Sequence, residues 1–282
     1  ETLDNIGGLG LLKDWLIKRK DAFGKRAMEY RLPSPKGLLI IGIPGTGKSL
    51  TAKATARVFE RPLLRLDAGR LYGGLVGESE ANARNVIKTV EAIAPCVLWL
   101  DEIEKGFAGS RSSGMTDGGT SSRVFGTFLS WMQDKTAPVF IVATANDVTQ
   151  LPPEMLRKGR FDELFFVDLP NAEERLAIWR IQIAKYGRKP EAFMIEGLVK
   201  ASEGFTGSEI EQAFIEALYL AFNQGKEPGD DTVLEALANS VPLGKLMGEH
   251  INTLRNWAKG RARPATASKE DPGERRMVVG LN

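Results

Sequence analysis

The stretch that most constrains this chain is the octapeptide GIPGTGKS, which begins at Gly42. It matches the pattern of a phosphate-binding loop, in which four residues separate a glycine from Gly-Lys-Ser. Residues 37–41 before it are apolar and are typical of a buried parallel strand, and residues 50–60 after it are typical of a helix. A chance glycine turn would lack these two flanks. The sequence therefore predicts an α/β fold that binds a nucleoside triphosphate.

Each residue of this loop has a predicted part in holding the nucleotide. Glycines let the backbone curl so that several N–H groups point at one phosphate, and the following helix adds the partial positive charge of its N-terminus. The Lys48 ammonium can reach the β- and γ-phosphates, and the Ser49 hydroxyl can bind Mg²⁺. The residues predicted to contact the nucleotide here are Pro44, Gly45, Thr46, Gly47, Lys48, Ser49 and Leu50.

A second motif consists of an apolar run that ends in two acids. Residues 96–100 are apolar and lead into Asp101 and Glu102. Such a strand buries itself in a sheet and delivers the acids at its carboxyl end, beside the phosphate loop. Asp101 can then hold Mg²⁺, directly or through water, and Glu102 can act as general base on the attacking water. The motif is common by itself and gains specificity from its place after a phosphate loop.

Two further polar sites follow. Asn146 ends the apolar run 139–145, where it can orient the hydrolytic water or sense the γ-phosphate; the alternative is a cap of the strand end. Arg157 and Arg160 lie around a glycine before another predicted strand. A guanidinium is always charged and carries a planar fork of donors, which suits a phosphoryl transition state. The alternative is a pair of surface arginines.

Composition excludes several classes of protein. The chain has 282 residues, of which 43% are hydrophobic and 26% charged, enough for one large or two smaller domains. A net charge of +2 gives no indication of nucleic-acid or membrane binding, and no apolar run approaches the length of a membrane span. The single cysteine, Cys96, excludes an internal disulfide and fits a reducing compartment such as the cytoplasm.

The pattern divides the chain into three parts. Residues 1–170 are predicted to form a large α/β nucleotide-binding domain, and residues 171–258 a helical domain. Residues 259–282 contain several Arg and Lys among Pro, Ala and Ser, and are predicted to be a flexible basic tail. The chain begins with Glu rather than Met, and we interpret it as a piece of a longer protein.

Together these motifs resemble the AAA family of ATPases, in the branch with the second region of homology, over residues 4–258. The phosphate loop corresponds to Walker A, and residues 98–102 end Walker B. The resemblance implies a P-loop NTPase fold, in which helices sandwich a parallel five-stranded sheet and a small α-helical lid domain follows. It also implies ATP and Mg²⁺ as cofactors and a homo-oligomeric ring, a hexamer.

The same resemblance implies roles for further residues. Asn146 matches the residue called sensor 1, and Arg157 and Arg160 match arginines that the family presents across a subunit interface as arginine fingers. The adenine-contacting residues would be the turn Ile6 and Gly7, and the pair Gly207 and Ser208. The family has Gly-Ala-Asp-Leu at that pair, whereas this chain has Gly-Ser-Glu-Ile, which puts the details of the adenine contact in doubt.

The substrate-handling loop departs from the family pattern. Family members that thread polypeptides usually carry aromatic-hydrophobic-Gly in the first pore loop, where this chain has Leu75, Val76 and Gly77. Three functions stay open: a machine that remodels a protein client, an ATP-dependent assembly switch or scaffold, and a nucleic-acid loader. The near-neutral charge disfavours the loader.

The C-terminal run of the chain carries a closer resemblance. Residues 241–264 are similar to those of a AAA protein of cyanobacteria and algal plastids. This similarity implies that the chain is the C-terminal ATPase portion of such a protein. It also implies a plastid stroma where the protein is plastid-encoded, and a link to photosynthesis-related regulation.

Overall fold

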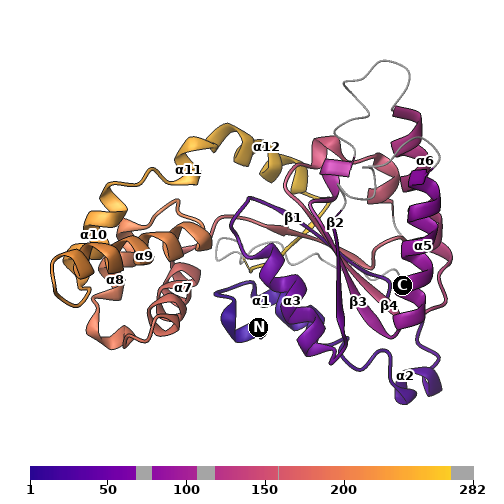
Figure 1. The fold of residues 1–282 in the computed structure, drawn as a ribbon, viewed down its shortest axis with the longest axis horizontal. Coiled ribbons are helices and arrows are strands. Elements are labelled where there is room, and N and C mark those ends of the chain that lie inside the picture. The colour runs from indigo at the N-terminus through magenta and orange to yellow at the C-terminus, as the bar shows by residue number, and fades with distance from the viewer. Residues whose placement is uncertain (68–77, 107–117, 158, 268–282) are drawn as a thin grey trace, which may run out of the picture.

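The computed structural model describes residues 1–67, 78–106, 118–157 and 159–267 (Figure 1). Within these residues, six parallel strands form one sheet in the order β2-β3-β4-β1-β5-β6. The strands are β1 (Gly37–Gly42), β2 (Leu63–Asp67), β3 (Cys96–Asp101), β4 (Val139–Ala145), β5 (Glu163–Val167) and β6 (Arg263–Pro264). The predicted α/β fold with a parallel sheet is confirmed.

Both faces of the sheet are buried, which explains the continuous apolar runs of its strands. Along β1, Leu39 and Ile41 contribute to one core cluster, while Leu38 and Ile40 contribute to another. Helices α5 (Glu78–Ile93) and α6 (Gly118–Asp134) cover the first face. Helices α1 (Gly10–Ile17) and α3 (Lys48–Val58) cover the second.

A separate group of helices lies beyond one end of the sheet (Figure 1). Its members are α7 (Ala172–Lys185), α8 (Ile195–Ala201), α9 (Gly207–Asn223) and α10 (Asp230–Ala238). They pack around a core of their own, in which Trp179 and Phe214 are fully buried. The Asn171 and Thr206 side chains cap the N-termini of α7 and α9. This group is the predicted helical lid.

Helices α11 (Leu243–Leu246) and α12 (Gly248–Ala258) return from the lid to the sheet (Figure 1). The α12 side chains Ile251 and Leu254 lie in the core cluster of the sheet rather than in that of the lid. Arg255 of α12 also donates twice to Asp168, through Nε at 2.7 Å and Nη2 at 2.9 Å. The last helix assigned to the lid by sequence is therefore packed on the α/β layer.

The prediction of five strands and a flexible tail from residue 259 is wrong in part. β6 lies within that tail and pairs with β5, with Phe165 opposite Arg263 and Phe166 opposite Pro264. Ala265 beside it is buried at 1% exposure, in the cluster on the α1 side of the sheet. A two-residue strand has no periodicity that a sequence can reveal. The rest of the predicted tail, 268–282, lies outside the described residues.

Among the described residues, no helix has the length and apolar character that a bilayer crossing requires. The remaining elements are short. The short helices are η1 (Leu3–Asn5), α2 (Lys25–Glu29), η2 (Ile103–Gly106), η4 (Val148–Gln150), η5 (Pro153–Leu156) and η6 (Pro190–Ala192).

The burial of Lys135, the residue that follows α6, can be tested through the pH dependence of stability. Burial lowers the pKa of Lys135 from 10.5 to about 8, against the opposing effect of Asp162. Between those values the unfolded chain binds more protons than the folded one, so stability rises with pH across the window. We expect Lys135→Met to remove the part of this rise that comes from Lys135, which is at most about 1.4 kcal/mol per pH unit, and to leave the part that comes from Lys48, whose pKa is also lowered to about 8. Urea unfolding at about pH 7 and about pH 9.5 checks the difference.

The matched control is Lys88→Met, which changes an exposed lysine on α5. It should keep the wild-type pH dependence. Equal pH dependence of wild type and Lys135→Met would contradict the lowered pKa.

Candidate functional site

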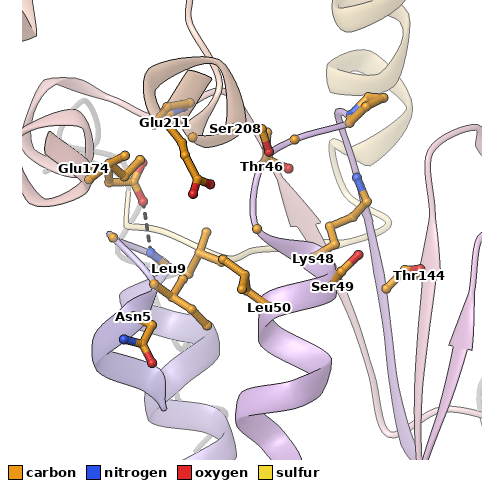
Figure 2. Close-up of a pocket in the computed structure, with 18 of the residues that line it drawn as sticks. Asn5, Leu9, Thr46, Lys48, Ser49, Leu50, Thr144, Glu174, Ser208 and Glu211 are labelled. Carbon is orange, nitrogen blue, oxygen red and sulfur yellow. Dashed lines mark hydrogen bonds between the residues drawn. The ribbon is translucent and has the colours of Figure 1, made fainter. Parts of the chain in front are cut away.

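The site lies at the carboxyl edge of the sheet, where β1, β3 and β4 end beside the lid. A pocket of about 330 Å³ opens there, within the size range of small-molecule sites. Figure 2 shows Lys48 and Ser49 toward one end of the pocket, and Asn5 and Leu9 toward the other. Its lining includes every residue predicted for the nucleotide, namely Ile6, Gly7, Pro44, Gly45, Thr46, Gly47, Lys48, Ser49, Leu50, Gly207 and Ser208.

The phosphate loop has the backbone that its glycines were expected to allow. Gly45 and Gly47 have φ of +78° and +92°, in the left-handed region that favours glycine. A Cβ at Gly45 would lie 2.8 Å from the Thr206 hydroxyl oxygen, so a larger residue would also collide with the lid. The Thr46 hydroxyl closes the loop by donating to the Ile43 carbonyl at 2.7 Å. The loop is therefore held in shape by its own contacts.

Lys48 is buried at the start of α3, at 6% exposure. Its ammonium donates to the carbonyls of Gly42 at 2.8 Å and Ile43 at 2.7 Å. Burial lowers the pKa of Lys48 to about 8, although Glu104, Glu102 and Asp101 oppose the shift. A buried cation beside three acids is well placed to exchange loop carbonyls for phosphate oxygens.

Asp101 is fixed from two sides. The Thr144 hydroxyl donates to its Oδ1 at 2.8 Å, and the Arg65 Nη2 donates to its Oδ2 at 2.9 Å. The Thr144 oxygen in turn accepts the backbone N–H of Glu102 at 3.0 Å. Because β3 and β4 are adjacent parallel strands, with Leu100 opposite Ala143, this hydroxyl falls between the two acids. Thr144 therefore sets the positions of both acids.

Glu102 and Asn146 face each other across the ends of the same two strands. The Asn146 Nδ2 donates to Glu102 Oε1 at 3.1 Å, and Lys105 forms an ion pair with Glu102 Oε2. Glu102 has φ of +48°, an uncommon conformation for a residue with a side chain. Backbone strain of this kind clusters at functional sites. A water molecule beside this pair would be within reach of both a carboxylate and an amide.

Glu104 holds the backbone of Asn146 in place. It is buried at 5% exposure, and its Oε1 accepts the backbone N–H of Asn146 at 2.9 Å. Burial raises the pKa of the Glu104 carboxyl, which the hydrogen bond from Asn146 opposes. Asn146 thus contacts one carboxylate through its side chain and another through its backbone.

The side chains at the phosphate end fit a hard divalent cation. The Ser49 hydroxyl and the Asp101 carboxylate both line the pocket, and oxygen ligands of this kind suit Mg²⁺. The described residues contain no group of three or more His, Cys, Asp or Glu side chains that could hold a metal ion. Phosphate oxygens and water would have to complete the coordination, as is usual for Mg²⁺ at nucleotide sites.

The opposite end of the pocket joins the N-terminal turn, α7 and the start of α9. The Ser208 N–H donates to the Gly45 carbonyl at 3.1 Å, which links the lid to the phosphate loop. A Cβ at Gly7 would lie 2.4 Å from Ile178 Cγ1, so only glycine lets the turn approach α7 this closely. Ile6, Ile178 and Ile181 give this end an apolar wall, suited to a flat base.

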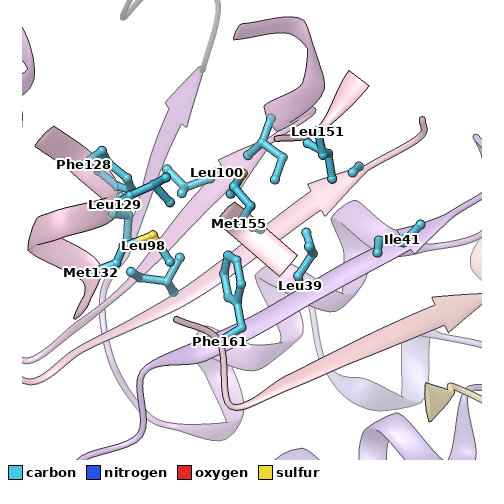
Figure 3. Close-up of a cluster of buried hydrophobic side chains, with 14 of the residues drawn as sticks. Leu39, Ile41, Leu98, Leu100, Phe128, Leu129, Met132, Leu151, Met155 and Phe161 are labelled. Carbon is cyan, nitrogen blue, oxygen red and sulfur yellow. The ribbon is translucent and has the colours of Figure 1, made fainter. Parts of the chain in front are cut away.

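Two of the predicted residues, Arg157 and Arg160, do not line the pocket. Arg157 is exposed, and the partly exposed Arg160 donates from Nη1 to the Glu154 carbonyl at 2.7 Å. Their segment is anchored by Met155 and Phe161, which are buried in the core cluster shown in Figure 3. Leu75, Val76 and Gly77 of the predicted pore loop lie outside the described residues.

Sequence reasoning missed three of the residues that build the site. Thr144 was read only as part of an apolar strand, and Glu104 had no motif of its own. Glu174 has no motif either, yet it lines the pocket and accepts the Leu9 N–H at 3.0 Å. A signal existed for Thr144 alone, because a polar residue two positions before Asn146 points to the same face of the strand.

A scan against protein families supports the reading of the site. Residues 38–169, from β1 to just beyond β5, match the family described as "ATPase family associated with various cellular activities (AAA)". The chain belongs to the AAA family of ATPases. Membership implies binding of a nucleotide together with a divalent metal.

Relatives of this AAA chain match it over almost all of its length. It is 52% identical over 264 residues to the AAA domain-containing protein ycf46 of Pyropia yezoensis, covering 93% of this chain and 53% of the relative. It is 50% identical to ycf46 of Trieres chinensis, covering 95% and 54%. A cell division cycle protein 48 homologue of Archaeoglobus fulgidus is 31% identical, covering 80% and 31%. The chain spans about half the length of the ycf46 relatives.

Thr144→Val tests the hydroxyl that joins the two acids. The change keeps the shape of the buried side chain and removes the bonds to Asp101 and to the Glu102 backbone. We expect the ATPase kcat to fall roughly tenfold, because the acids lose their alignment, while ADP affinity changes less than about twofold. Steady-state kinetics and ADP titration calorimetry measure the two.

Thr144→Ser keeps the hydroxyl and should retain most of the rate. Thr55→Val is the matched control, because that buried hydroxyl bonds only to Thr51 of its own helix among the described contacts. A wild-type kcat in Thr144→Val would contradict the role given to this residue.

Proposed function

We propose that this protein hydrolyses ATP with Mg²⁺, at sites that two neighbouring subunits of a homo-oligomeric ring complete together. The phosphate loop and Lys48 hold the phosphates, and Ser49 and Asp101 provide protein ligands for the ion. Ile6, Gly7, Gly207 and Ser208 hold the adenine end. The proposal is supported by the pocket that gathers these residues and by membership of the AAA family.

Hydrolysis is assigned to the pair Glu102 and Asn146. Glu102 takes a proton from the attacking water, and the Asn146 amide orients both that water and the carboxylate. Their 3.1 Å contact at the pocket edge supports this division of roles. Lys48 stabilises the charge that develops on the transferred phosphoryl group, and an ion held by Ser49 and Asp101 would supply further positive charge there.

The position of Arg157 and Arg160 supports a site shared between two subunits. Phosphoryl transfer gains from a guanidinium at the γ-phosphate, yet Arg157 and Arg160 do not line the pocket of their own chain. The exposed Arg157, on a segment anchored in the core, is available to a second copy instead. Head-to-tail contacts of this kind close into a ring where the rotation between copies allows it. The number six is proposed from the resemblance to the AAA family.

Mixing two inactive variants tests the shared site. Glu102→Gln lacks the base but keeps the arginines, and Arg157→Ala lacks an arginine but keeps the base. Each alone should lose about 10³-fold or more in kcat. In a random equal mixture, about one quarter of the interfaces combine an intact Glu102 with an intact Arg157. We expect the mixture to recover up to about one quarter of the wild-type rate per site.

A mixture no faster than its two components would show that Arg157 does not act across an interface. The wild-type rate per protomer should also rise with protein concentration, because dilution separates the two halves of each site. Glu102→Gln should still bind ATP, measured by calorimetry, which separates loss of the base from loss of the fold.

We further propose that the ring remodels a protein client, with Leu75, Val76 and Gly77 as its contact loop. Leu75→Ala and Val76→Ala should then abolish ATP-dependent change in a captured client, while ATPase activity without client stays within about twofold. The client is obtained by affinity capture with Glu102→Gln in the full-length protein. Unchanged client processing in both loop variants would favour the second candidate, an assembly switch driven by ATP binding.

The remaining assignments follow from chemistry and from the relatives. The near-neutral net charge of +2 disfavours a nucleic-acid partner. Cys96 is buried and reduced, which suits the cytoplasm or the plastid stroma. Similarity to the ycf46 proteins of Pyropia yezoensis and Trieres chinensis supports a plastid setting. A link to photosynthesis-related regulation is part of the proposal.

A further inference from the structure

The segment that follows α12 ends against the nucleotide pocket. After β6 pairs with β5, the Ala265 N–H donates to the Phe166 carbonyl at 2.9 Å. The Ala265 carbonyl accepts the N–H groups of Leu11 and Leu12, at 3.0 and 3.1 Å. These two amides belong to the first turn of α1, whose N-cap residue Leu9 provides no side-chain cap. The C-terminal segment therefore supplies the acceptor that this helix start otherwise lacks.

The next residue reaches the pocket lining itself. The Thr266 hydroxyl donates to Glu174 Oε1 at 2.6 Å. The same oxygen accepts the Leu9 N–H at 3.0 Å, and Glu174 Oε2 accepts the Asn171 N–H at 3.1 Å. Figure 2 shows the contact between Leu9 and Glu174 at the end of the pocket away from Lys48. One carboxylate thus joins the N-terminal turn, the start of α7 and the C-terminal segment.

This carboxylate is buried and closely packed. Glu174 is 8% exposed, so these donors, rather than bulk water, satisfy its oxygen atoms. A Cβ at Gly8 would lie 2.1 Å from Glu174 Oε1, so the turn approaches α7 as closely as glycine permits. The two segments that Glu174 holds together both line the pocket. The turn contributes Ile6 and Gly7, and α7 contributes Ile178.

We propose that residues 263–266 are part of the nucleotide site, with Thr266 and Glu174 as positioning residues that hold the turn of residues 6–9 against α7 and so set nucleotide affinity. The inference rests on the proposed binding of ATP at this pocket. Thr266 acts through Glu174 and does not touch the phosphates. Its loss should therefore weaken binding at the base end and leave the hydrolytic groups in place.

The alternative is that the hydrogen bond from Thr266 to Glu174 is a staple, meaning a purely structural contact that stabilises the fold and leaves the pocket unchanged. The two differ in what they alter, because a staple lowers the melting temperature without a change in affinity. A positioning residue changes the affinity of the folded protein and leaves kcat at saturating ATP unchanged.

The test is the ADP affinity of Thr266→Val in the assembled protein, measured by titration calorimetry. This variant keeps the side-chain shape and removes the hydroxyl. We expect the Kd for ADP and the KM for ATP to rise about tenfold, with kcat at saturation within about twofold of wild type. Thr266→Ser keeps the donor and should restore the affinity.

Thr89→Val is the matched control, because that exposed hydroxyl on α5 donates to the Asn85 carbonyl, away from the pocket. It should bind ADP as wild type does. Thr266→Ala removes the same donor without the extra methyl group, and it gives the same answer if Thr266→Val fails to fold.

Wild-type ADP affinity in folded Thr266→Val would overturn this inference and leave the proposed function intact. A lower melting temperature with unchanged Kd would overturn it as well, in favour of the staple. If wild type itself bound no ADP while folded, the proposed function would fail, and the Thr266 inference with it.

Discussion

The whole site depends on one constraint, a parallel sheet buried on both faces. Because both faces of the central strands β1, β3 and β4 are covered, their polar side chains lie at the strand ends, and the carboxyl ends all lie on one edge. Asp101, Thr144 and Asn146 gather at that edge, in register with the loop that follows β1. The hydrogen bonds among them then fix a geometry that no single strand could provide.

The same packing explains why the pocket has two different ends. At the phosphate end, Lys48 is buried, and the negative charges of Glu104, Glu102 and Asp101 favour its charged form. At the base end, the walls are apolar and come from segments far apart in sequence, and a single carboxylate, Glu174, holds them together. Under the proposed function, affinity and turnover depend on different contacts and can be changed separately.

The sequence anticipated the phosphate loop, the acids and Asn146 because each has a local signature set by spacing. It also anticipated the parallel sheet, whose β1, β3 and β4 are continuous apolar runs. It did not anticipate Glu104 or Glu174, since a buried carboxylate looks like any surface acid until its donors are known. It missed β6 as well, because two residues at the sheet edge are defined only by their partner, β5.

The sequence by itself determined which chemistry is present: a glycine loop with Lys48 and Ser49, and a strand that ends in Asp101 and Glu102. These features are local, and a short stretch of chain is enough to specify them. Only the tertiary structure decided what holds them together, from the Thr144 hydroxyl between two acids to the Thr266 hydroxyl on Glu174. Contacts between residues 92 positions apart are set by how the layers pack, and no local pattern encodes them.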